Sequence, residues 1–138
     1  MTYAPDREDT FPVPIEPAVL TVHLVNSAAE TNVPIYIPWN KCRLMYGYAI
    51  VTSAIDGSGA MEIDLELDAA DGTAMATVSV TASDAVGTVT ELTISDEAAC
   101  SNLSRADTGR DAINFEIDGS SGAAGEVDVI LYFERSGC

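Results

Sequence analysis

The chain has 138 residues and a formal net charge of −16, from 22 acidic and 6 basic side chains. This length is typical of one domain, and 47% hydrophobic residues is too high a share for a disordered chain. The negative charge repels nucleic-acid phosphates and anionic lipid headgroups, so we expect neither nucleic acid nor membrane among the partners.

The first part of the chain is rich in proline. Four of the six prolines lie within residues 1–17, where their fixed φ and missing N–H groups oppose both helix and sheet. We therefore expect an extended arm over residues 1–17 and one β-sandwich domain over residues 18–138. The arm either folds back over its own domain or docks on a neighbouring subunit. Its apolar residues, which we take as candidate partner contacts, are Tyr3, Phe11, Val13 and Ile15.

Alternation of apolar and polar residues predicts strands along the rest of the chain. The clearest case is residues 61–68, where four apolar side chains alternate with four carboxylates, which predicts one buried and one anionic face. Two prolines demote residues 33–38 to an edge or a short bridging segment, and Gly47 predicts a bulge or bend. The predicted strands are 19–25, 33–38, 42–55, 61–68, 73–82, 86–95, 112–118 and 126–134.

The number and length of these segments predict the fold class. About eight short strands are joined by Gly-rich and Asp-rich turns, and helix is limited to one or two turns after Asp96. We expect an all-β protein, an antiparallel β-sandwich that is jelly-roll-like in size, with an extended N-terminal arm.

The cysteines and the start of the chain indicate no export. Cys42, Cys100 and Cys138 are too few and too far apart for a disulfide framework, and no C-x-x-C pair suggests zinc or redox chemistry. The first residues lack the cationic and apolar regions of a secretion signal. We expect free thiols in a reducing cytoplasm and no export by the Sec route.

No residue pattern predicts an active site or a cofactor. The single histidine, His23, has no nearby partner for metal binding or nucleophilic catalysis, so we interpret it as a packed or surface residue. The carboxylates of residues 61–68 share one strand face, whereas a glycosidase needs two opposed acids. The acidic loops near Asp56 and Asp68 do not match a calcium-loop pattern, and turn chemistry explains them equally well. We expect no enzyme, no metal and no cofactor.

One further segment suggests a partner contact. Trp39 lies beside Lys41 and Arg43, and tryptophan with a neighbouring cation is typical of interface hot spots. A tryptophan that closes the end of a sandwich would give the same pattern. Trp39, Lys41 and Arg43 therefore join the arm residues as candidate partner-binding residues.

Several strand-like stretches carry a family resemblance. Residues 61–67 (MEIDLEL), 72–75 (GTAM), 110–121 (RDAINFEIDGSS) and 129–134 (VILYFE) resemble sequences of the head-decoration, or cement, proteins of tailed bacteriophages. The similarity covers the C-terminal half of the chain and consists of alternating strand residues rather than of a signature motif.

The resemblance implies a structural virion protein without catalytic or cofactor residues. Such a protein would be assembled in the host cytoplasm, would decorate and stabilise the capsid exterior, and would bridge major-capsid subunits. Its partners would be the major capsid protein and neighbouring copies of itself, in a homo-oligomer on the capsid lattice. The alternative is a tail or receptor-binding β-domain that recognises host-surface carbohydrate.

Overall fold

The computed structural model describes residues 17–35, 37, 42–55, 59–67, 74–81, 84–97, 100, 103, 113–118 and 124–135. The arm residues 1–16, together with Trp39 and Lys41, lie outside the described residues. Pro17, the last residue of the predicted arm, is the first residue of the first strand.

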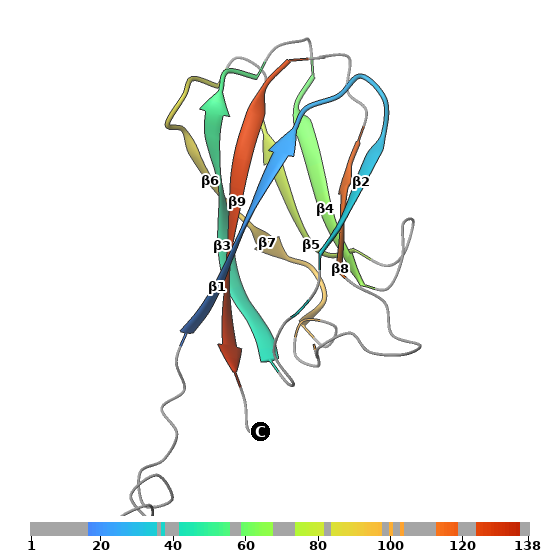
Figure 1. Cartoon of the computed structure of the whole chain (residues 1–138), viewed down its shortest axis with the longest axis vertical. Coiled ribbons are helices and arrows are strands. Elements are labelled where there is room, and N and C mark those ends of the chain that lie inside the picture. The colour runs from blue at the N-terminus through green and yellow to red at the C-terminus, as the bar shows by residue number, and fades with distance from the viewer. Residues whose placement is uncertain are drawn as a thin grey trace, which may run out of the picture.

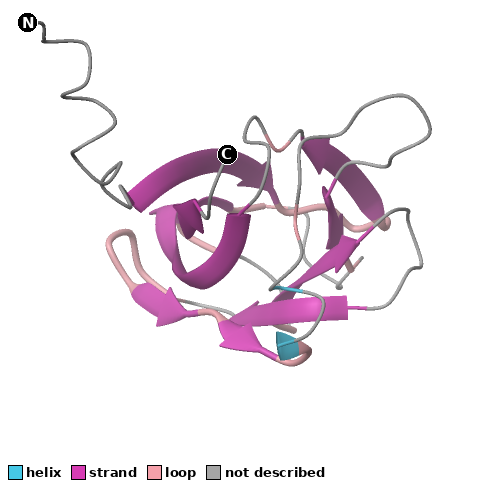
Figure 2. Cartoon of the chain, turned by 90° about the horizontal axis from the view of Figure 1, so that it is seen from below, coloured by secondary structure: helices cyan, strands magenta, loops and turns pink. Residues whose placement is uncertain are grey.

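Two antiparallel sheets face each other and form a sandwich (Figures 1 and 2). The four-stranded sheet has the order β1 (Pro17–Val25), β9 (Glu126–Arg135), β3 (Cys42–Ser53) and β6 (Val89–Glu91). The five-stranded sheet has the order β2 (Thr31–Ile35), β8 (Ile113–Ile117), β4 (Met61–Leu67), β5 (Ala74–Val80) and β7 (Thr93–Ile94). The predicted all-β antiparallel sandwich is confirmed.

The core lies between the two sheets and follows the period of two in the sequence. Val127, Val129, Leu131 and Phe133 of β9 are at most 1% exposed, while the residues between them are partly exposed. They pack with residues such as Phe115 in a single cluster of buried residues. Each Leu or Phe buried in this way contributes about 2 to 3 kcal/mol of transfer free energy.

Strand β3 contains the predicted irregularity at a different residue. Its register with β9 shifts between Leu44 and Tyr46 and again between Val51 and Ser53, so the extra residues are Met45 and Thr52 and not Gly47. Gly47 is needed for a close approach, because a Cβ there would lie 2.7 Å from the carbonyl oxygen of Ile130. The predicted bulge at Gly47 is therefore wrong by two residues.

The predicted strand 86–95 divides between the two sheets. Its first part, β6, pairs with β3, and its second part, β7, pairs with β5. Leu92 lies between them, is 5% exposed, and donates its backbone N–H to the Gly47 carbonyl at 2.8 Å. The chain thus crosses from one sheet to the other while Leu92 fills the core. Both pieces are edge strands of three residues or fewer, which offer little backbone for pairing with another chain.

Candidate functional site

The outer surface of the four-stranded sheet carries a cluster of aromatic and aliphatic side chains. The Met45 bulge changes the alternation of β3, so that Leu44 faces the core while Tyr46 and Tyr48 face outward. The register places Tyr46 opposite Tyr132 of β9 and Tyr48 opposite Ile130. On the other side of β9, Tyr132 lies opposite Val19 of β1. We call this surface the tyrosine face, and its residues are Val19, Tyr46, Tyr48, Ile130 and Tyr132.

The three tyrosine rings of this face are in mutual contact. Tyr46 and Tyr132 are stacked, with ring centroids 4.7 Å apart and planes inclined by 20°. Tyr48 meets both rings edge to face, at 5.9 Å from each centroid. Partial burial raises the pKa of the Tyr48 hydroxyl, with smaller contributions from Tyr46, Tyr132 and Glu91. Mutual contact fixes the rings without covering them, since Tyr46 remains 43% exposed and Val19 46% exposed.

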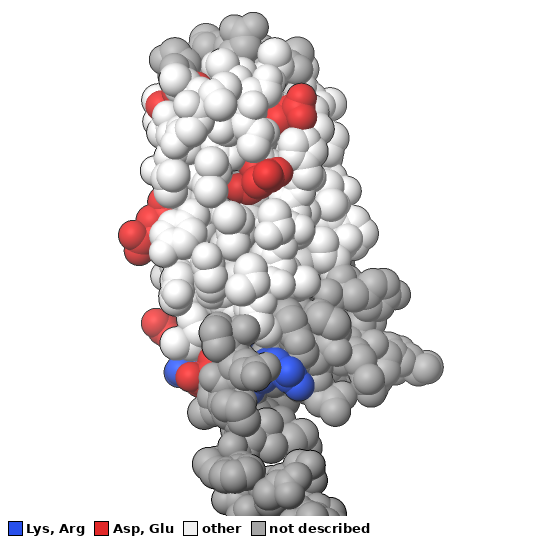
Figure 3. All heavy atoms as spheres, turned by 60° about the vertical axis from the view of Figure 1, so that its left-hand side comes forward, with Lys and Arg blue, Asp and Glu red and all other residues white. Residues whose placement is uncertain are grey.

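Charged side chains lie at the two ends of the tyrosine face. At one end, Arg43 donates to Glu134 over 3.1 Å, and at the other end His23 lies between Glu126 and Asp128. Figure 3 shows this side of the molecule as mostly uncharged, with the acidic side chains in isolated groups and the blue side chains of the described arginines in the lower part. On the β6 side, Glu91 lies directly opposite Tyr48, so the tyrosine face is an aromatic surface bounded by ion pairs at its two ends and by this carboxylate at its side.

His23 is held by two carboxylates of the adjacent strand. Its Nδ1 lies 2.7 Å from an Asp128 oxygen and its Nε2 lies 2.7 Å from a Glu126 oxygen. The hydrogen bonds to Asp128 and then Glu126 raise the pKa of His23 above 6.5. Because both ring nitrogens are occupied, the imidazole serves as a cross-strand link between β1 and β9 and not as a free base.

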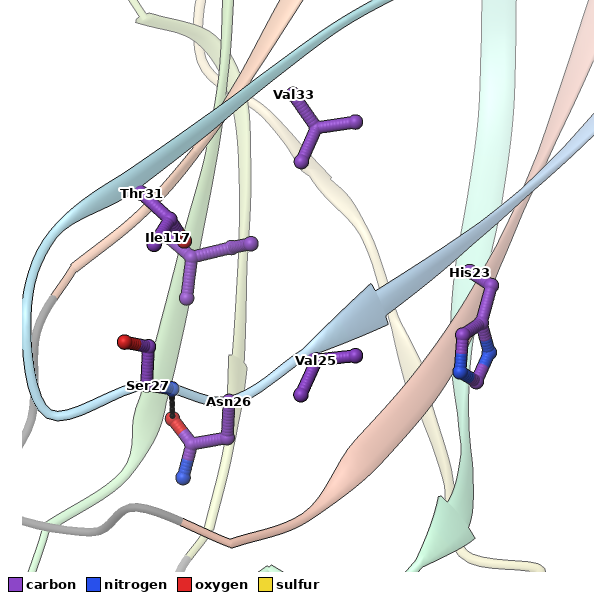
Figure 4. A pocket seen from close by; sticks show the side chains of 7 residues that line it. All are labelled: His23, Val25, Asn26, Ser27, Thr31, Val33 and Ile117. Carbon is purple, nitrogen blue, oxygen red and sulfur yellow. Dashed lines mark hydrogen bonds between the residues drawn. The ribbon is translucent and has the colours of Figure 1, made fainter.

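A shallow pocket of about 370 Å³ lies where β1 turns into β2 (Figure 4). Asn26 accepts a hydrogen bond from the Ser27 backbone N–H at 3.0 Å and donates to the Ala124 carbonyl at 3.1 Å. The lining offers no nucleophile with an adjacent base, because the nitrogens of His23 are bound elsewhere. The residues that line it are His23, Val25, Asn26, Ser27, Thr31, Val33 and Ile117.

The outer surface of the five-stranded sheet has the opposite character. Asp64 of β4 lies directly opposite Glu116 of β8, with Glu62 and Glu66 beside it on the same strand. Burial is the main cause that raises the pKa of the Asp64 carboxyl, and the negative charges of Glu66, Glu62 and Asp118 raise it further. We call this surface the acidic face; its carboxylates are Glu62, Asp64, Glu116 and Asp118, while the neighbouring Glu66 is only 4% exposed and accepts a hydrogen bond from Asn114. The predicted anionic strand face thus lies beside further acids of β8.

The candidate partner-binding residues from the sequence do not come together in the described structure. Arg43 projects outward from β3 and pairs with Glu134 at the end of the tyrosine face. Trp39 and Lys41 fall outside the described residues, as do the four arm residues. The sequence prediction missed Tyr46, Tyr48 and Tyr132. Their spacing indicated strands, but the bulge that turns the first two outward was placed at the wrong residue.

The described residues form neither a metal site nor a reactive-thiol site. Among them, no group of three or more His, Cys, Asp or Glu side chains could hold a metal ion. Cys42 and Cys100 are free and buried, and burial raises the pKa of each thiol to about 11, so neither is a reactive thiolate. None of the helices in the described part of the chain is long and apolar enough to cross a membrane.

Comparison with known proteins finds similarity to a solved structure. No family model matches the chain, and no curated protein matches it. A search of solved structures finds a chain from Bacillus endospore appendages, which are described as a novel family of disulfide-linked pili. That chain has 16% sequence identity to this one and a TM-score of 0.49, and the alignment covers 88% of each chain.

This finding contradicts the predicted resemblance to phage head-decoration proteins. The matching chain belongs to an endospore appendage and not to a phage capsid. The predicted capsid function, its carbohydrate-binding alternative and the predicted location on a virion are therefore wrong. The major capsid protein is likewise not supported as a partner. The predicted resemblance was wrong because it depended on alternating apolar and polar strand residues, a pattern that unrelated β-sandwiches share.

Proposed function

We propose that this chain is a non-enzymatic structural subunit that associates with copies of itself through the tyrosine face. The observation that carries the proposal is the exposure of stacked tyrosines and a valine on the outside of a protein with net charge −16. Charged residues are depleted and tyrosine is enriched in the centre of protein interfaces. The tyrosine face has that composition, and its ion pairs lie where a polar rim would lie.

Charge favours this surface over the other sheet. Two copies that met through the acidic face would bring several carboxylates from each copy together, at a large desolvation and repulsion cost. On the tyrosine face, the carboxylates of Glu126, Asp128 and Glu134 are already paired with His23 or Arg43. A second copy therefore meets least electrostatic resistance on the tyrosine face.

The aromatic cluster also has the rigidity that binding favours. The rings of Tyr46 and Tyr132 are stacked before any partner arrives, and Tyr48 supports both from the side. Side chains that are ordered in the free protein lose little conformational entropy on association, whereas each flexible side chain costs about 0.5 to 1.5 kcal/mol to immobilise. The tyrosine face can therefore bind a partner at a low cost in conformational entropy. The apolar surface that it would bury favours association, and no catalytic step is involved.

A matched pair of valines on β1 tests the proposal. Val19 lies beside Tyr132 and is 46% exposed, while Val25 projects from the same side of the same strand, opposite Glu126, and is 52% exposed. Sedimentation velocity should give full-length protein a mass that rises above 14.5 kDa with concentration. Val19→Thr should weaken this association about fivefold to tenfold, because an unpartnered hydroxyl costs about 1 kcal/mol or more to bury.

Val25→Thr is the control, since it makes the same isosteric change about six residues, roughly 20 Å, from Val19 along the strand. It should leave self-association unchanged. A wild-type protein that stays at 14.5 kDa at every concentration would contradict the proposed function. Equal weakening by both substitutions would show that another part of β1 makes the contact.

A further inference from the structure

We propose that the ligand of the tyrosine face is the Pro-rich segment, residues 1–16, of a neighbouring copy. This inference rests on the proposed self-association and names the element that each copy contributes. The resulting contact joins two different surfaces, so copies connect head to tail and not face to face.

The chemistry of the tyrosine face suits a proline-rich ligand. Proline-rich segments in the polyproline II conformation bind surfaces lined by aromatic rings, where the flat rings receive the pyrrolidine rings. The stacked pair of Tyr46 and Tyr132 and the inclined ring of Tyr48 supply three such rings on neighbouring strands. The aliphatic side chains of Val19 and Ile130 extend the surface across β1 and β9.

The segment itself has the matching composition. Pro12 and Pro14 alternate with Phe11, Val13 and Ile15, and because polyproline II has three residues per turn, Pro14 shares one side of the segment with Phe11 and Pro12 shares another with Ile15. Proline also fixes φ before binding, which reduces the conformational entropy that docking would cost. An apolar, proline-rich sequence of this kind matches a surface that is aromatic and uncharged at its centre.

The segment ends beside the tyrosine face. Pro17, where β1 begins, lies opposite Glu134, and Val19 lies opposite Tyr132 of that face. In the polyproline II conformation, 16 residues would reach about 50 Å, which is longer than the roughly 33 Å of the ten-residue strand β9. The segment is therefore long enough to cross from one copy to a whole face of the next.

The prolines favour docking on another copy over docking on the same copy. Phe11, Val13 and Glu16 each precede a proline, which disfavours the helical conformation and favours the extended conformation at all three residues. If residues 11–16 are extended, they continue the line of β1 away from the sheet, because Pro17 is the first residue of that strand. Reaching the tyrosine face of the same copy would require a reversal within this stretch, whereas a neighbouring copy requires none.

A mixing experiment with two full-length variants tests the head-to-tail contact. The segment variant carries Phe11→Ser, Val13→Ser and Ile15→Ser, and the face variant carries Tyr46→Thr and Tyr132→Thr. Each variant alone should lose at least about tenfold in self-association, which sedimentation velocity measures. The mixture should form a complex of twice 14.5 kDa that does not grow, because it contains one intact segment and one intact face.

Circular dichroism and thermal unfolding show whether the face variant is folded; if it is not, Val19→Thr takes its place in the mixture. Undiminished association of the segment variant alone would overturn this inference and indicate a face-to-face contact, while the proposed self-association would stand. A mixture that remains at 14.5 kDa, when wild-type protein associates, would also overturn it. A wild-type protein that does not associate would reject the proposed function itself.

Discussion

His23 must be positively charged in the folded protein if both neighbouring carboxylates are ionised. Ionised carboxylates only accept hydrogen bonds, so nitrogens at 2.7 Å from Asp128 and Glu126 must both carry protons. The imidazolium form is therefore favoured, in agreement with its raised pKa. Since β1 is an edge strand that, within the described part of the chain, forms its ladder with β9, this link secures the strand that follows the proline-rich segment.

This arrangement predicts a pH-dependent contribution to stability. Because the folded pKa of His23 lies above 6.5, its contribution is fully present below that value and is lost as pH rises through the folded pKa. Urea unfolding should therefore show the largest difference between wild type and His23→Thr near pH 6, with the difference closing as pH rises through the folded pKa of His23. His23 is the only histidine in the chain, so no other imidazole titrates in this range. A difference that is constant or grows with pH would contradict the role of His23.

At the scale of single elements, the acidic face of β4 and β8 is held together despite its charges. The inward residues of β4, Ile63 and Leu65, are fully buried, and this burial offsets the repulsion between the outward Asp64 and Glu116. Asn114 donates to Asn32 at 2.7 Å and to Glu66 at 3.3 Å, which joins β2, β8 and β4. Burial of the apolar side of β4 thus stabilises the strand enough to offset the repulsion on its anionic side.

Removing one charge from this face should stabilise the protein. The folded pKa of Asp64 is raised, so its favourable contribution is present at acidic pH and is lost as pH rises through that pKa. At neutral pH Asp64→Asn should raise the free energy of unfolding by up to about 0.5 kcal/mol, less at high salt, because the site is partly solvated. Urea titration measures the change.

The same substitution in β9 provides the control. Asp128→Asn removes a partner of His23 and should lower the free energy of unfolding below the folded pKa of the imidazole. The two Asp→Asn substitutions should therefore change the free energy of unfolding in opposite directions, because Asp64 lies beside other carboxylates whereas Asp128 pairs with His23. A loss of stability in Asp64→Asn would show that its charge is compensated in the folded protein.

The elements differ in how well the sequence predicted them. Strict alternation predicted the strands around β4, β8 and β9, because one buried face requires a period of two. The division of residues 86–95 and the bulge at Met45 were not predicted, since both depend on which strand lies alongside. The tyrosine face was missed for the same reason: the side to which Tyr46 and Tyr48 point is set by pairing with β9.

At the scale of the whole molecule, a charge of −16 opposes the association of copies. Repulsion between like-charged molecules acts over about 10 Å at 0.1 M salt and shortens as salt is added. Burial of apolar surface is not weakened by salt, and sulfate or phosphate strengthens it. Association through an aromatic surface should therefore respond to salt in the opposite direction from association through ion pairs.

Sedimentation equilibrium of the full-length protein at low and high sodium chloride tests self-association through the tyrosine face most directly. Our account predicts that the weight-average mass exceeds 14.5 kDa and rises with salt, as screening removes the repulsion between copies. A mass that stays at 14.5 kDa under all conditions, or that falls as salt is added, would contradict it.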